Sequence, residues 1–358
     1  MTAPRLEIDL AKIDHNARTL VGRLAARGIS VTGVTKATLG SPEFARTLKG
    51  AGVTGLGDSR IENIEAMRAA GVTATMTLLR SPMPSQVGRV VASADVSLNT
   101  ELDVIAMLSD AAGRLGLTHR VVLMVELGDL REGIMPGDLE DVVRRVLRLP
   151  DLTLAGIGTN LACRSGVAPD AEKMGELSAL AGDIEATFGI HLETVSGGSS
   201  ANLEWALGSA DVGRINDLRL GEAILLGREP LRRQPIDGLH TDAIALVAEV
   251  IESKAKPSMP WGQTAQPAFG GTPPAADRGL VVQTIVALGH QDVDPAGLTP
   301  PPGTHIMGAS SDHLVLESDH RMMSGAELSF QLNYSALVRA MTSPFVARRF
   351  VTAPHRSR

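Results

Sequence analysis

Short apolar runs alternate with stretches of helical spacing along the first 230 residues of the chain. Residues 31–36 contain the first strand-like run of this series, in which β-branched residues dominate. Similar runs follow at 53–57, 75–79, 96–98, 120–126, 152–160, 192–196 and 211–220. Helical patterns lie between them, most clearly at 42–48, where Ser41 is a suitable N-cap, and at 171–188.

Eight strand–helix units in about 200 residues predict an α/β fold of the TIM (β/α)8 barrel type at residues 11–230. The alternative is an open, doubly wound sheet. That alternative is disfavoured because no G-x-G-x-x-G motif follows the first strand.

The pattern changes near residue 230. Short strand-like runs at 243–251, 279–288, 305–307, 314–316 and 326–332 predict a mainly-β C-terminal domain at 231–358 with little helix. Residues 254–274 are rich in Pro and Gly and predict a loop. The alternating segment at 5–10 is expected to join this domain, since a barrel needs no ninth strand.

Composition and charge narrow the class of protein. Hydrophobic residues make up 44% of the chain and charged residues 21%, as in soluble globular proteins. The net charge of −6 and the lack of a long basic run disfavour nucleic-acid or anionic-membrane binding. The single cysteine, Cys163, excludes an intramolecular disulfide, and no apolar stretch reaches about 18 residues. We therefore expect a cytoplasmic protein.

Polar residues end the predicted barrel strands, where the chemistry of this fold is found. They are Lys36, Asp58, Arg80, Asn99, Arg131, Asn160, Ser199, Ser200, Arg219 and Gly221. Lys36 is a candidate for a Schiff base with a carbonyl group. The alternative for Lys36 is a lysine that extends from a strand end into solvent.

Two loops after the last predicted strands suggest a phosphate site. Gly-Gly-Ser-Ser at 197–200 and Leu-Gly-Glu at 220–222 can offer hydroxyl and backbone N–H groups. A Gly-rich segment such as 197–200 can also be a simple flexible turn. Together with Lys36, these loops suggest a phosphorylated carbonyl cofactor, pyridoxal 5′-phosphate (PLP).

With these motifs in view, the chain resembles the alanine-racemase-type PLP enzymes (fold type III), and within them ornithine racemase and related amino-acid racemases. The resemblance covers nearly the whole chain and rests on the order and spacing of its motifs. The matching segments are Glu7–Leu10 with His15-Asn16, 34–36, 58–60, 129–133, 195–200, 218–222, 226–228, 291–292 and 308–313.

The resemblance implies a role for each matching residue. Lys36 would hold the cofactor covalently and act as one acid/base, and Arg219 would face the pyridine nitrogen and keep it unprotonated. Arg131 would lie near the cofactor's phenolic oxygen or the substrate carboxylate. Asn160 occupies the place of a histidine that contacts the cofactor ring. The phosphate ligands would be Ser199, Ser200 and the backbone N–H groups of Gly221 and Glu222.

One departure from the family pattern leaves the second acid/base open. Alanine racemases supply a tyrosine from the partner subunit's β-domain, but the corresponding segment here, 257–262, contains none, and the single tyrosine is Tyr334. The candidates are His313 with Asp312 beside it, His290 and Cys163. We favour His313, because imidazole titrates near neutral pH. Phe345 stands where the family has a tyrosine that binds phosphate.

The leading hypothesis is a PLP-dependent racemase that exchanges the Cα proton by two bases, acting on ornithine or another basic amino acid. The alternatives are a PLP-dependent D-threonine-type aldolase and a non-catalytic PLP carrier. The aldolases use a metal bound by a histidine–cysteine pair that is not evident here, so no metal is expected. Carriers lack the β-domain. Like the family, the protein is expected to form a homodimer with shared active sites. A substrate amine could face Asp58, Asp129, Glu132 or Glu222.

Overall fold

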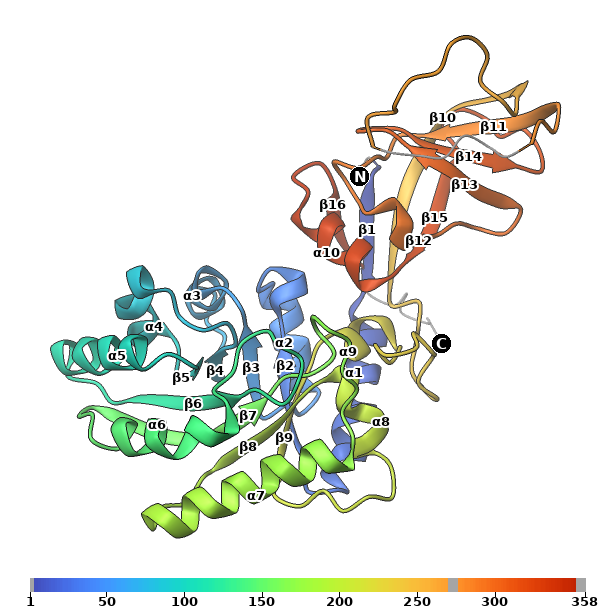
Figure 1. Ribbon diagram of the computed structural model, residues 1–358. Coiled ribbons are helices and arrows are strands. Elements are labelled where there is room, and N and C mark those ends of the chain that lie inside the picture. Colours follow the sequence, from blue (N-terminus) through green and yellow to red (C-terminus); the bar gives the residue numbers. More distant parts are fainter. Residues whose placement is uncertain (1–2, 270–275, 352–358) are drawn as a thin grey trace, which may run out of the picture. The chain divides into compact units, whose positions relative to one another are not determined.

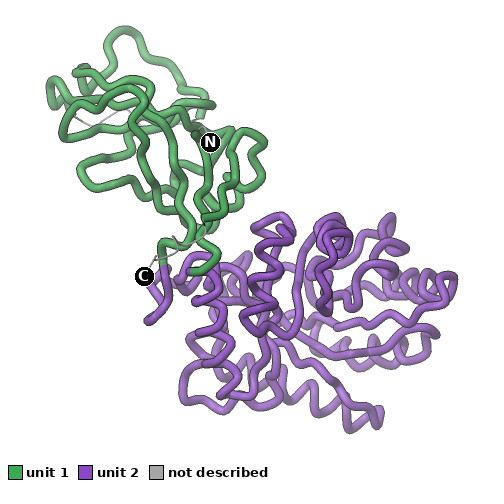
Figure 2. Tube along the Cα trace, turned by 180° about the vertical axis from the view of Figure 1, so that it is seen from behind, with its two compact units in different colours: residues 1–11, 241–358 green, residues 12–240 purple. Residues whose placement is uncertain are grey.

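The computed structural model of the protein describes residues 3–269 and 276–351 and divides the chain into two units (Figure 2). One unit spans Lys12–His240. The other combines the N-terminal segment through Ala11 with the chain from Thr241 onward. Each unit has its own sheet, so each is described by itself.

The barrel unit (unit 2 in Figure 2) contains a closed barrel of eight parallel strands (Figure 1). The strands are β2 (Ser30–Val34), β3 (Gly55–Asp58), β4 (Thr75–Leu78), β5 (Val96–Asn99), β6 (His119–Val125), β7 (Leu152–Thr159), β8 (Thr194–Ser199) and β9 (Asp217–Leu220). The barrel closes because β9 pairs with β2, in a register that puts Arg219 opposite Thr32. The prediction of a TIM-type barrel is confirmed.

Helices follow the strands and surround the barrel (Figure 1). They are α1 (Leu10–Ala25), α2 (Pro42–Gly50), α3 (Ile61–Ala69), α4 (Val87–Ser93), α5 (Leu102–Leu115), α6 (Leu139–Val146), α7 (Ala171–Phe188), α8 (Leu203–Ala206) and α9 (Glu222–Leu226). Ser41 caps α2, since its hydroxyl accepts a hydrogen bond from the Phe44 N–H at 3.3 Å. The predicted helix at 171–188 has the bounds of α7.

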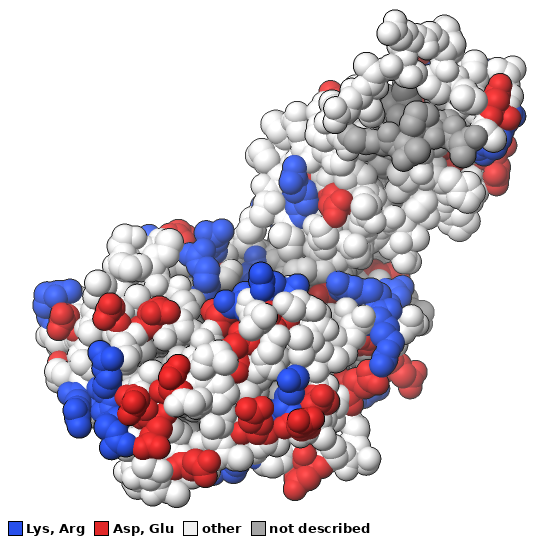
Figure 3. Space-filling model, viewed as in Figure 1, with Lys and Arg blue, Asp and Glu red and all other residues white. Residues whose placement is uncertain are grey.

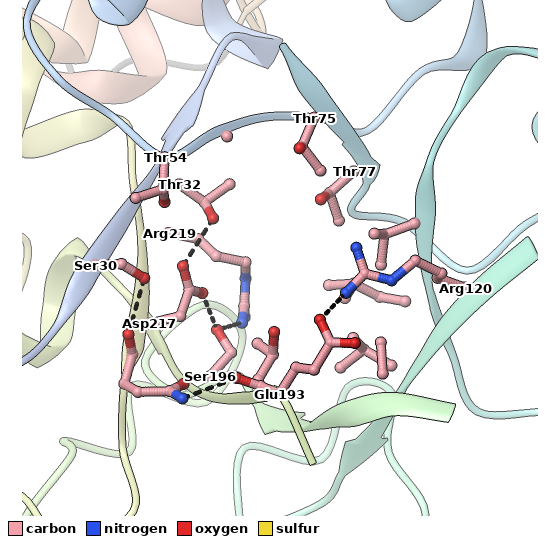
Figure 4. A pocket seen from close by; sticks show the side chains of 17 residues that line it. Ser30, Thr32, Thr54, Thr75, Thr77, Arg120, Glu193, Ser196, Asp217 and Arg219 are labelled. Carbon is pink, nitrogen blue, oxygen red and sulfur yellow. Dashed lines mark hydrogen bonds and ion pairs between the residues drawn. The ribbon is translucent and has the colours of Figure 1, made fainter. Parts of the chain in front are cut away.

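The barrel interior contains both an apolar cluster and polar side chains. An apolar cluster joins β5, β6 and β7 through Val96, Leu98, Val122, Met124 and Ala155. Strands β2, β8 and β9 carry hydroxyl and charged side chains toward the interior (Figure 4). TIM barrels normally fill this space with branched apolar residues, so these polar side chains are unusual.

The β unit (unit 1 in Figure 2) consists mainly of strands. Its strands are β1 (Arg5–Asp9), β10 (Ile244–Pro257), β11 (Leu280–Val286), β12 (Leu298–Thr299), β13 (Thr304–Ala309), β14 (Leu314–Ser318), β15 (Glu327–Leu332) and β16 (Ala347–Val351). They follow the order β12-β15-β10-β11-β14-β13, and β1 pairs with both β10 and β16. The N-terminal strand therefore lies in the β unit, as expected from the sequence.

Several sequence-based boundaries differ from the structure. β10 continues to Pro257, where the sequence predicts a loop from residue 254, because this segment pairs with β11. The rest of the described part of that stretch, 258–269, lies outside any strand or helix, and 270–274 fall outside the described residues. The strand expected at 211–220 begins only at Asp217, since Asp211 accepts a hydrogen bond from Gly213 N in a turn.

The β unit also contains a helix that the sequence analysis missed, α10 (Tyr334–Thr342). The boundary between the units falls at His240 rather than at residue 230. Asn16 on α1 explains this position. It donates hydrogen bonds to the carbonyl oxygens of Ile224 and His240 and accepts one from His240 N, which holds the 231–240 segment to the barrel unit.

Charged side chains of both signs are mixed across the visible face of the barrel unit (Figure 3). Within residues 3–269 and 276–351, each helix is too short or too polar to cross a membrane.

Candidate functional site

The carboxyl ends of the barrel strands share one rim, because the strands are parallel and the sheet is closed. This rim and the loops that leave it carry the predicted barrel residues Lys36, Arg131, Asn160, Ser199, Ser200, Arg219, Gly221 and Glu222. His313 and Asp312 belong to the β unit and are described with that unit.

Lys36 lies two residues beyond the end of β2, in a short 3₁₀ turn, and its side chain is exposed. The residue before it is held firmly. The buried Thr35 hydroxyl donates to a carboxylate oxygen of Asp58 at 2.7 Å. A fixed backbone with an accessible amine is the arrangement that a covalent attachment point requires.

Arg219 on β9 has the opposite environment, since only 6% of its surface is exposed. Its guanidinium donates hydrogen bonds to Ser196 Oγ at 2.6 Å, to the Thr159 carbonyl oxygen at 2.9 Å and to Asn160 Oδ1 at 3.4 Å. Burial lowers the pKa of Arg219, and the nearby Asp217 carboxylate opposes this effect. Arginine nevertheless remains a cation at neutral pH.

Asn160 follows β7 and contributes an unsatisfied donor at the rim. Its Oδ1 accepts from Arg219, whereas its Nδ2 is buried and has no hydrogen-bond partner among the residues that the structure describes. A buried amide nitrogen without an acceptor is costly, and a ligand with an acceptor atom would satisfy it.

The loops after β8 and β9 meet through Ser200, whose buried hydroxyl accepts a hydrogen bond from Ala223 N at 3.2 Å. Gly221 packs closely against β2, because a Cβ at this position would lie 3.1 Å from Val34 Cβ. The Glu222 side chain forms an ion pair with Arg233. Burial raises the pKa of Glu222, opposed by Arg233 and Lys36. Only the backbone of Glu222 suits an anion.

The loops after β6 and β7 meet where Cys163 N donates a hydrogen bond to Asp129 Oδ2 at 3.2 Å, close to Arg131 and Glu132. Nε and Nη2 of Arg131 donate hydrogen bonds to the Glu132 carboxylate, and Cys163 lies near enough to influence the Arg131 guanidinium. Glu132 first, and Cys163 to a smaller extent, raise the pKa of Arg131 against the effect of burial. Cys163 therefore lies at the rim beside a cation, a contact that sequence spacing did not reveal.

Two of the acidic residues proposed to bind a substrate amine already accept hydrogen bonds from other parts of the protein. Asp58 is fully buried and accepts hydrogen bonds from Thr35, Arg60 N and Asn63. Burial raises the pKa of Asp58, although these bonds partly oppose it.

The fully buried Asp129 accepts from the backbone N–H groups of Cys163, Arg164 and Ser165. Burial tends to raise the pKa of Asp129, but these hydrogen bonds outweigh it and lower the pKa. Asp58 and Asp129 thus hold loops in place, and neither is available for a substrate amine.

In the β unit, two loops that contain the predicted motifs pack together. His290 N and Gln291 N donate to the carbonyl oxygens of Ser310 and Ser311 at 3.0 and 2.9 Å. Gly289 permits this approach, since a Cβ there would lie 2.3 Å from Asp312 N. The exposed His313 imidazole hydrogen-bonds through Nδ1 to Asp312 at 2.9 Å, and this contact lowers the pKa of Asp312.

On one rim, the parallel barrel carries an exposed lysine, a buried arginine and a Ser/Gly-rich loop, and this rim is where TIM-barrel enzymes have their active sites. Residues 8–229 match the family described as alanine racemase, N-terminal domain. The chain belongs to this family, and it is an amino-acid racemase.

Two curated relatives cover almost the whole chain. The lysine racemase of Thermotoga maritima is 39% identical over 352 residues, which are 97% of this chain and 98% of the relative. The ornithine racemase of Acetoanaerobium sticklandii is 34% identical over 97% of this chain and 99% of the relative.

Solved structures support the fold. The alanine racemase from Streptomyces coelicolor A3(2) superposes with a TM-score of 0.77 at 20% identity, covering 97% of each chain. The D-threonine aldolase from Filomicrobium marinum gives 0.72 at 19% identity, covering 95% of this chain and 88% of that one. At such identities the likeness concerns the fold alone, so the aldolase alternative gains no support for its chemistry.

Proposed function

We propose that the protein is a PLP-dependent racemase that inverts the Cα configuration of a basic amino acid, with lysine or ornithine as the first candidates. The observation that carries the proposal is the placement of Lys36, Arg219 and the Ser200–Gly221 loops on one barrel rim. The substrate class is supported by the lysine and ornithine racemases that match over 97% of the chain.

The residues present fit PLP. The exposed Lys36 amine is free to form a covalent bond, and the Ser199 and Ser200 hydroxyls with the backbone N–H groups of 221–222 form a donor set for a phosphate. The unpaired Asn160 Nδ2 offers one more donor to an acceptor on the cofactor ring. Arg219 presents a cation from the strand next to Lys36.

When bound, PLP supplies the carbonyl that captures an amine and a ring that delocalises the electron pair left at Cα. The chain's own residues do the rest. Arg219 would donate a hydrogen bond to the ring nitrogen and, as a cation, would keep it unprotonated, which would favour prompt return of the proton to Cα. Arg131 would orient the substrate carboxylate.

Inversion needs a proton donor or acceptor on each face of Cα. We assign Lys36 to one face and His313, oriented by Asp312, to the other. The alternatives for the second face are His290, in the β unit, and Cys163, which follows β7 and contributes to the raised pKa of Arg131.

We further propose a cytoplasmic homodimer in which the partner subunit supplies His313. C₂ pairing is the commonest oligomer.

Chiral chromatography of L-lysine, L-ornithine, L-arginine and L-alanine incubated with the PLP-loaded protein tests the substrate class. We expect D-enantiomers of lysine or ornithine to form at least about tenfold faster than D-alanine, since a site built for an ω-amine penalises its loss. Faster racemisation of alanine would contradict the basic substrate. Cleavage of a β-hydroxy amino acid to an aldehyde would favour the aldolase.

A further inference from the structure

A cavity of ≈190 Å³ lies in the barrel interior (Figure 4). Its lining combines four members of the apolar cluster, Val96, Leu98, Val122 and Ala155, with polar side chains that include Ser30, Thr32, Thr54, Ser196, Asp217 and Arg219. Charged groups inside a barrel are costly unless they are paired, so the presence of Asp217 and Arg219 there needs a reason.

Three neighbouring strands bring these side chains together. Thr32 on β2 lies opposite Arg219 on β9, and Ser196 on β8 lies opposite Asp217 on β9. Asp217 and Arg219 are two residues apart on one strand and so face the same side of the sheet. The cluster is therefore fixed by the barrel register and does not depend on loops.

The donor and the acceptor of each hydrogen bond in this cluster can be assigned. Arginine can only donate, so Ser196 Oγ accepts from the Arg219 guanidinium at 2.6 Å. An ionised carboxylate can only accept, so the Ser196 hydroxyl donates to Asp217 Oδ2 at 2.6 Å. Thr32 donates to the other oxygen, Oδ1, at 2.7 Å.

The chain of hydrogen bonds from Asp217 through Ser196 to Arg219, called the relay below, holds one side of the buried guanidinium. Nη1 of Arg219 is bound to Ser196, while Nη2 is bound at the rim to the Thr159 carbonyl oxygen and to Asn160. A planar guanidinium held at both nitrogens cannot rotate freely. Asp217, with 7% of its surface exposed, supplies the countercharge through the serine.

We propose that Asp217 is a positioning residue: through Ser196 it fixes the orientation of Arg219 and offsets part of its charge, and so sets the electrostatic effect of Arg219 on the cofactor ring. This inference rests on the proposed function for the role of the ring, but the orientation of Arg219 can be tested without it. If Ser196 and Asp217 only stabilised the fold, replacing them would change neither the position of the Arg219 guanidinium nor the ionisation of bound PLP.

The test compares Ser196→Ala and Asp217→Asn with Ser30→Ala as the matched control. Ser30 lines the same cavity, but its hydroxyl donates to the Asn216 carbonyl oxygen, which the Ser30 N–H also binds. Ser196→Ala removes the link and keeps both charges. Asp217→Asn keeps the shape and removes the charge. Crystal structures of the three variants and a pH titration of the visible absorbance of bound PLP are the two measurements.

In Ser196→Ala, we expect the Arg219 guanidinium to move by about 1 Å or more and kcat to fall about 100-fold, the cost of such a displacement. In Asp217→Asn, the missing negative charge should disfavour the protonated form of bound PLP and lower the pH midpoint by about one unit. Ser30→Ala should match the wild type in both measurements.

An unmoved guanidinium in Ser196→Ala would overturn the positioning role. An unchanged midpoint in Asp217→Asn, or an equal shift in Ser30→Ala, would overturn the electrostatic role. If Asp217→Asn does not fold, Ser196→Ala decides the proposal. If the wild type binds no PLP, the proposed function fails, and the crystal structures still decide whether Asp217 orients Arg219.

Discussion

Lys36 and Arg219 belong to neighbouring strands of the barrel, yet one amine is exposed and the other cation is buried. The difference suits their proposed tasks. A lysine that must form and break a covalent bond needs freedom to move, whereas an arginine that polarises a ring needs a fixed direction. The hydrogen bonds of Arg219 to Ser196 and Thr159 provide that direction.

For individual residues, the sequence indicates which side chains are candidates for the active site but not which of them are in contact. Lys36 and Arg219 follow from strand ends and from the family pattern. The contact of Cys163 with Arg131 depends on two loops of irregular backbone, which no periodic pattern specifies. For the same reason the loop-anchoring roles of Asp58 and Asp129 could not be separated from substrate binding by sequence alone.

Replacing His313 and Cys163 in turn distinguishes these two candidates for the second base. His313→Gln is expected to lower kcat for racemisation by about 1000-fold, because one face of Cα loses its proton carrier. Lys36 should still exchange the α-proton of one enantiomer in deuterium oxide. Cys163→Ser serves as the comparison and should retain most activity. The opposite result, loss in Cys163→Ser and retention in His313→Gln, would assign the second face to Cys163.

Elements with strong periodicity were predictable, and those without it were not. The apolar stripe of α7, with Met174, Leu177, Ala181 and Ile184 buried, fixes that helix in the sequence. α10 has a similar stripe, but it is only nine residues long and follows a run of strands, so its apolar pattern is too short to distinguish it from them. Its N-cap, Asn333, accepts from Ala336 N at 2.9 Å and was the available signal.

The β5–β6 pair contains a buried histidine outside the proposed site. His119 is 2% exposed and hydrogen-bonds through Nε2 to Ser97 Oγ at 2.8 Å. Burial lowers the pKa of His119 to about 4. The folded protein therefore holds this imidazole neutral, whereas the unfolded chain protonates it near pH 6.5.

This difference makes the barrel sensitive to acid. The stability from neutral His119 is fully present above about pH 6.5 and is lost as the pH falls toward 4, by up to about 3 kcal/mol. His119→Gln should flatten the dependence of the free energy of unfolding on pH between those values, as measured by urea titration. The exposed His305 is the control, and His305→Gln should leave the dependence unchanged. An unaltered slope in His119→Gln would contradict the assignment.

The whole molecule combines distant parts of the chain. β1 pairs antiparallel with β10 and parallel with β16, so the first and last described strands belong to one sheet. The sequence predicted that β1 joins the C-terminal strands. It could not locate the boundary at residue 240, which depends on the three hydrogen bonds of Asn16.

Shared active sites can be tested by mixing subunits. Lys36→Ala and His313→Gln should each be nearly inactive alone. After subunit exchange, half of the dimers should be mixed, with one site that carries both changes and one intact site. Random pairing thus returns about a quarter of the wild-type activity. Failure to regain activity under conditions that exchange subunits, or a monomer in analytical ultracentrifugation, would contradict the shared site.

The central claim is that Lys36 and PLP together exchange the Cα proton of a basic amino acid. Proton NMR of L-lysine and L-ornithine in deuterium oxide with the PLP-loaded protein measures this exchange directly. We expect loss of the α-proton signal together with formation of the deuterated D-enantiomer, no exchange with Lys36→Ala, and wild-type exchange with the matched control Lys49→Ala, whose amine binds Thr73 on the surface. Exchange by Lys36→Ala at the wild-type rate, or none by the wild type with any basic amino acid, would contradict the account.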